Sequence, residues 1–165
     1  MTRQELQIRL AALFEENGLA RVHPDATAMT ARAALESLAG LPQYEQLWAG
    51  DLHSGVQLVA VASGERLPGV ELSRRAQLLA ERASAMSLRV KGPVQALQLV
   101  IYERAVPRQE SDFVLAKGRV GSWMPFTRGK AGTWLFALAE PALHARKLRG
   151  WPPELSPDEL RKLLQ

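Results

Sequence analysis

The chain has no cysteine among its 165 residues. Disulfide bonds and thiol catalysis are therefore excluded, and a reducing compartment fits this composition. Charged residues recur from Arg3 to Arg9, where a signal peptide would place its apolar core. We therefore expect a cytoplasmic protein.

Long apolar runs are also missing, because the longest mostly apolar stretches are as short as 56–62 and 134–139. A membrane-spanning helix needs about 18 apolar residues or more. Hydrophobic residues make up 47% of the chain and charged residues 23%, which is ordinary for a globular domain. The length predicts one domain with a core of its own, so we expect a water-soluble protein with no membrane insertion.

Histidine is scarce, and His23, His53 and His144 stand far apart. None of them has the spacing of a metal-binding pair, so no metal site is expected. Ser122 follows Gly121, but the GxSxG pattern of a nucleophilic serine is absent. The sequence therefore predicts no catalytic residue of these two classes.

Carboxylates and glycines also fail to form a recognised site. A metal-dependent nuclease site would need Glu103, Asp112 and Lys117 to converge from adjacent strands. Asp112 and Lys117 are an odd number of positions apart, so on one regular strand they would point to opposite faces, which disfavours such a site. Gly129 and Lys130 precede an alanine, where a phosphate-binding P-loop needs serine or threonine. No cofactor is expected. A role as an enzyme of an unrecognised kind ranks third, after a nucleic-acid-binding role and a protein-interaction role.

Acidic residues are nearly absent from one part of the chain. The net charge is +4, yet residues 1–55 carry four cations and seven acids. Residues 115–150 carry seven cations and a single acid, Glu140. Such asymmetry favours an anionic partner, although a merely solvated basic surface is the alternative. The candidate nucleic-acid-binding residues are Arg119, Arg128, Lys130, Arg146, Lys147 and Arg149.

Hydrophobic periodicity and capping residues predict the helices and strands. Helices are expected at 2–17, 25–39, 70–89 and 141–150, with another starting at Ser156. Strands are expected at 55–64, 94–104, 112–118 and 132–140, and residues 42–48 fit a short turn or helix.

These elements predict an α/β (α+β) fold in the order ααβαβββαα, with a four-stranded, mostly antiparallel sheet and helices packed on it. The helix at 70–89 follows the first strand and could act as a crossover. Residues 1–150 are expected to form a single α/β domain. The Trp-Pro-Pro run that follows predicts a C-terminal hinge and helix at 151–165.

The glycine-rich stretch 118–134 is best interpreted as two strand connections. Its GxxG pattern at 118–121 also occurs in KH domains, but a KH loop joins two helices, whereas the residues that follow look extended. We expect residues 127–132 to form a hairpin tip with its cations in water, while Trp123, Phe126 and Trp134 pack across strands.

The sequence therefore predicts a non-catalytic binding domain that contacts nucleic acid through the basic C-terminal half. A protein-interaction or regulatory domain with a protein partner is the main alternative.

Overall fold

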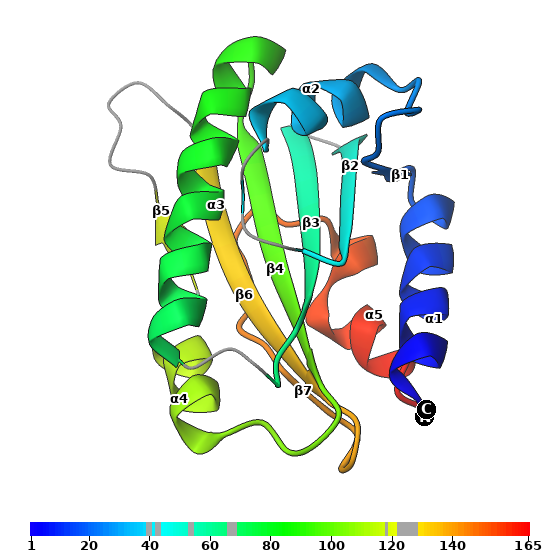
Figure 1. Ribbon diagram of the computed structural model, residues 1–165, viewed down its shortest axis with the longest axis vertical. Helices are drawn as coiled ribbons and strands as arrows, with labels where there is room; N and C mark the ends of the chain where they lie inside the picture. The colour runs from blue at the N-terminus through cyan, green and yellow to red at the C-terminus, as the bar shows by residue number, and fades with distance from the viewer. Residues whose placement is uncertain (39–40, 42–43, 53–54, 66–68, 118, 122–128) are drawn as a thin grey trace.

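The fold is α/β, with a mixed sheet between two layers of helices (Figure 1). The computed structural model describes residues 1–38, 41, 44–52, 55–65, 69–117, 119–121 and 129–165. Among them are the helices α1 (Arg3–Glu16), α2 (Met29–Ser37), α3 (Gly69–Val90), α4 (Arg108–Lys117) and α5 (Pro157–Lys162), and the short 3-10 helix η1 (Pro153–Leu155).

The strands are β1 (Ala20–Arg21), β2 (Gln46–Leu52), β3 (Gly55–Ser63), β4 (Val94–Tyr102), β5 (Arg119–Gly121), β6 (Gly129–Ala137) and β7 (Ala142–His144). They follow the order β1-β2-β3-β4-β6-β5 across the sheet, and β7 also pairs with β6. The central strands β3, β4 and β6 are mutually parallel, whereas the outer pairings are antiparallel.

Alternating side chains of the central strands cover both faces of the sheet. On one face, Leu58 and Ala60 of β3 pack with the buried side of α3, which includes Leu79 and Ala83. Helices α2 and α4 lie on this same face. On the other face, Val59 and Val61 join the core cluster that contains α1 and α5. The strand expected at 55–64 is therefore the central strand β3, which is covered on both sides.

Local signals correctly predicted several elements. The helix expected at 2–17 is α1, where Thr2 and Glu5 form a capping box and Gly18 follows with a φ of 82°. The helix expected at 70–89 is α3, the crossover between the parallel strands β3 and β4, and it buries an apolar stripe of five residues: Leu72, Ala76, Leu79, Ala83 and Met86.

The expected four-stranded, mostly antiparallel sheet is wrong in its details. Residues 112–118 were expected to form a strand, but they lie mostly in α4, because the parallel pair β4 and β6 needs a crossover. Residues 42–48 were expected to form a turn or helix, yet Gln46–Leu52 is the strand β2, which pairs with β3.

The helix expected at 141–150 is also wrong, since this region contains the short strand β7. β5 pairs with β6 at residues 130–132, and β7 pairs with the same strand at 135–137, so the two share one edge of β6. Pro141 lies in the turn before β7 and does not begin a helix. Backbone pairing along this edge explains why an extended segment replaces the expected helix.

The last 15 residues pack onto the body of the protein. Trp151, Leu155 and Leu160 are buried in the same core cluster as Trp134 and Phe136 of β6. Detachment of residues 151–165 as a hinge and helix stays a prediction that this burial disfavours. No helix in the described residues is long and apolar enough to cross a membrane.

Candidate nucleic-acid interface

The backbone of residues 145–150 lies across one face of β4 and β6. The Nε1 atom of Trp134 in β6 donates a hydrogen bond to the carbonyl oxygen of Arg146 at 3.0 Å. Nearer the start of the strands, Nε2 of Gln95 in β4 donates to the carbonyl oxygen of Arg149 at 2.9 Å. The segment therefore runs back along the strands from their middle toward their N-terminal ends.

Gly132 allows this segment to approach the sheet closely. A Cβ atom at position 132 would lie 2.5 Å from Cδ1 of Leu148, which is far closer than two carbon atoms pack. Leu148 is buried and belongs to the core cluster of this face. A buried leucine and two hydrogen bonds thus hold a segment that has no helix or strand of its own after β7.

The cations of the segment point away from this buried contact. Arg146, Lys147 and Arg149 are exposed on either side of the buried Leu148. Lys130 is exposed near the start of β6, and its partner in the parallel ladder is Gln95, the residue that binds Arg149. We call these four exposed residues, Lys130, Arg146, Lys147 and Arg149, the basic surface.

The structure therefore brings together four of the six predicted residues, although Lys130 and Arg146 are 16 positions apart in sequence. Along β6, the distance from Lys130 to Trp134, the residue that binds Arg146, is about 13 Å at the usual rise of a strand. Arg119 begins β5 and pairs with Gly132, so its backbone borders this surface. Arg128 lies outside the described residues.

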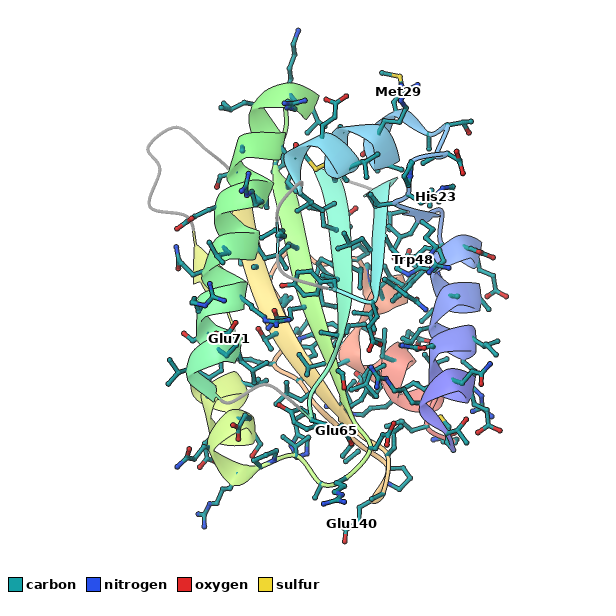
Figure 2. All side chains as sticks on the ribbon, viewed as in Figure 1. His23, Met29, Trp48, Glu65, Glu71 and Glu140 are labelled. Atoms are coloured by element: carbon teal, nitrogen blue, oxygen red, sulfur yellow. The ribbon has the colours of Figure 1, made fainter. Side chains whose placement is uncertain are left out.

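Three of the four cations of this surface form no ion pair with an acid in the part of the chain that the structure describes. None of the ion pairs found there includes Lys130, Lys147 or Arg149. Glu140 lies in the turn after β6, at the opposite end of that strand from Lys130, and Figure 2 shows it at the lower end of the molecule. The acid-rich first part of the chain forms its ion pairs elsewhere, as Glu45 does with Arg3.

The hairpin tip expected at 127–132 is placed differently. Residues from Gly129 onward already belong to β6, where Gly132 meets Leu148. Trp134 packs edge-on against Trp151, with ring centroids 6.1 Å apart. Trp123, Phe126 and Ser122 lie outside the described residues, so their expected positions stay predictions.

Residues between Ala145 and Arg161 also line a cavity of about 510 Å³ that is partly open to solvent and lies next to the basic surface. Lys147 lines both. Leu148 and Trp151 give the cavity an apolar wall, while Asp158 and Arg161 come from α5 and Ser156 is the residue before that helix. The sequence did not indicate this cavity, because its walls meet only when the C-terminal segment folds back onto β6.

His23, Glu103 and Asp112, which were considered as metal-binding or catalytic residues, take part in local contacts. In the described residues, no group of three or more histidine, aspartate or glutamate side chains could hold a metal ion. Nδ1 of His23 accepts a hydrogen bond from the backbone N–H of Asp25 at 3.2 Å, which is a local turn contact. Asp112 lies on α4, where its carboxylate is 3.7 Å from Arg108, and the backbone N–H of Glu103 donates to Glu65 at 3.1 Å.

Buried polar groups that no sequence pattern indicated lie on the α3 side of the sheet. The hydroxyl of Tyr102 and Oε2 of Glu110 are both buried, and neither has a hydrogen-bond partner among the residues that the structure describes. Burial raises the pKa of the Tyr102 phenol, and the negative charge of Glu110 raises it further. Tyr102 was expected in the strand at 94–104, and Glu110 lay outside every predicted helix and strand, so the sequence did not indicate this burial.

No protein-family model, curated protein or solved structure matches this chain. Any functional conclusion therefore depends on the geometry and charge described above.

Proposed function

We propose that this chain is a non-catalytic binding domain that contacts nucleic acid through the basic surface. The path of residues 145–150 carries this proposal, because their backbone is bound to Trp134 and Gln95 while their cations are exposed. Lysine and arginine side chains on a held backbone can bind phosphates without first ordering a loop. Phosphate contacts do not read bases, so we expect weak sequence preference.

The affinity should fall steeply with salt, because each phosphate contact releases condensed counterions. With three to four phosphates neutralised, the slope of log affinity against log salt concentration on duplex DNA is about −3. Fluorescence anisotropy of a labelled duplex over a series of salt concentrations measures this slope. A slope near zero would contradict phosphate contact.

Charge reversal at the basic surface tests its location. We expect Lys130→Glu combined with Arg149→Glu to weaken binding at least about tenfold at low salt and to make the salt slope shallower by about two. Both side chains are exposed, so the fold should tolerate the change. Anisotropy titrations with the same duplex give both quantities.

The matched control is Arg104→Glu combined with Arg108→Glu. These exposed residues follow the C-terminal end of β4, whereas Lys130 lies at the N-terminal end of the neighbouring parallel strand. The control changes the net charge equally, so a smaller loss of affinity is expected. Equal losses in the two double variants, or no binding at low salt, would favour the protein-interaction alternative.

A further inference from the structure

The cavity beside the basic surface has the size of a small-molecule site. Its volume of about 510 Å³ falls within the range of about 300–1,000 Å³ that ligand pockets occupy. It opens between residues 145–151, which lie on the sheet, and the segment that carries η1 and α5. Both walls are part of the folded body, because Leu148, Trp151 and Leu155 are buried in its core.

The apolar wall of the cavity includes an indole ring whose N–H needs no hydrogen bond from a ligand. Nε1 of Trp151 donates a hydrogen bond to the carbonyl oxygen of Leu155 at 2.9 Å. The polar atom of this indole is therefore satisfied inside the protein. Leu148 and Trp151 each keep 8% of their surface exposed, and with the half-buried Ala145 and the exposed Pro153 they line the cavity with apolar atoms that a flat, weakly polar group can cover.

The polar side chains of the cavity carry net positive charge. Lys147 is exposed, and none of the described acids forms an ion pair with it. Arg161 donates from Nη1 to Oδ1 of Asp158 at 2.6 Å, so one of the two cations is partly balanced. The hydroxyl of Ser156 accepts a hydrogen bond from the backbone N–H of Glu159 at 3.4 Å, and its own proton remains available to donate.

We propose that this cavity binds one nucleotide unit. Its phosphate would lie between Lys147 and Arg161, within reach of the Ser156 hydroxyl, and its base would cover the wall formed by Leu148 and Trp151. A nucleotide joins an anion to a flat ring system, which matches these two kinds of wall. The unit is either a free nucleotide or an unstacked nucleotide of a single strand; for the strand, the inference rests on the proposed function. Lys147 belongs to both sites, so a strand on the basic surface can reach the cavity.

Two variants of opposite sign test the cavity with adenosine monophosphate as the probe. Arg161→Gln removes a phosphate donor, and we expect the affinity to fall about tenfold. Asp158→Asn removes the competing carboxylate, and we expect the affinity to rise about threefold. Both side chains are largely exposed, at 47% and 85%, so the fold should tolerate each change. Isothermal titration calorimetry measures the affinities, and Arg104→Gln is the matched control outside the cavity.

The same variants are then titrated with a single-stranded oligonucleotide and with a duplex of the same sequence. If the single strand is preferred and Arg161→Gln abolishes that preference without weakening duplex binding, the ligand is a nucleotide of a strand. If the mononucleotide binds with the expected response to both variants and neither oligonucleotide binds, the cavity takes a free nucleotide and the proposed function is wrong. Salt-dependent binding of both oligonucleotides, with no mononucleotide binding and no effect of either variant, overturns the cavity proposal and leaves the proposed function standing. Absence of all binding overturns both.

Discussion

Gly129 is a residue whose missing side chain lets a helix lie directly on the sheet. A Cβ atom at this position would lie 2.1 Å from the backbone nitrogen of Ser84 in α3. A backbone atom cannot move aside as a flexible side chain can. We therefore expect Gly129→Ala to lower the free energy of unfolding by about 1–3 kcal/mol or more, measured by urea denaturation.

Gly92→Ala is the matched control for this prediction. The nearest atom to a Cβ at Gly92 is the carbonyl oxygen of Val90 at 3.9 Å, which is an ordinary contact. We expect the free energy of unfolding to change by less than about 0.5 kcal/mol. Similar losses in the two variants would contradict the close approach of α3 to β6.

Gly129 and Gly132 show why the residues next to a glycine in the sequence do not predict its tertiary contacts. Gly129 and Gly132 were interpreted as part of a hairpin tip because glycine is frequent in turns. Both lie in β6, where they face Ser84 and Leu148. Those partners are 45 and 16 positions away along the chain, so no local pattern could indicate the contacts.

At the scale of elements, the first turn of α3 contains an ion-pair cluster with a pH signature. Arg74, and to a lesser degree Arg75, hold the pKa of Glu71 at about 2, below its ordinary value of 4.5. Figure 2 shows Glu71 on this helix. Because the pKa is lower in the folded state, the stabilisation is present above pH 4.5 and is lost as the pH falls through about 2.

We expect the free energy of unfolding of Glu71→Gln to fall less than that of the unchanged protein as the pH drops from about 4.5 to about 2. Urea denaturation midpoints at the two ends of this range measure the change. Glu81→Gln on the same helix is the control, since its carboxylate accepts a hydrogen bond from the neutral Gln77 at 3.4 Å. An unchanged acid response in the Glu71 variant would contradict the ion pairs.

Long, strongly periodic elements were predictable, and among the short ones the capped helix α5 was predictable while α4 and β7 were not. Helix α3 has 22 residues and repeats its apolar stripe from Leu72 to Met86, a periodicity that fits only a helix. Residues 112–117 contain apolar residues that suit a strand or a helix equally, and the crossover to β6 decides for α4. β7 has three residues and depends on pairing with β6 for its conformation.

At the scale of the whole molecule, the C-terminal segment is expected to unfold with the rest. Trp151 is 8% exposed and contacts Trp134 of the sheet. We expect Trp151→Ala to cost about 3–5 kcal/mol of unfolding free energy, because the cavity it leaves opens into the main core. A single urea transition with the same midpoint by circular dichroism and by tryptophan fluorescence would support unfolding of the C-terminal segment together with the rest of the protein. A separate early transition would support the hinge.

The sequence by itself determined the α/β class, the capped first helix, the long helix α3 and the strands β3 and β4. Their signals are local, since periodicity and capping act within a few turns of chain. Only the tertiary structure decided the parallel centre of the sheet, the identities of α4 and β7, and the approach of Lys130 to Arg149 through Gln95. These depend on backbone pairing and packing between distant segments, whose partners local patterns do not specify.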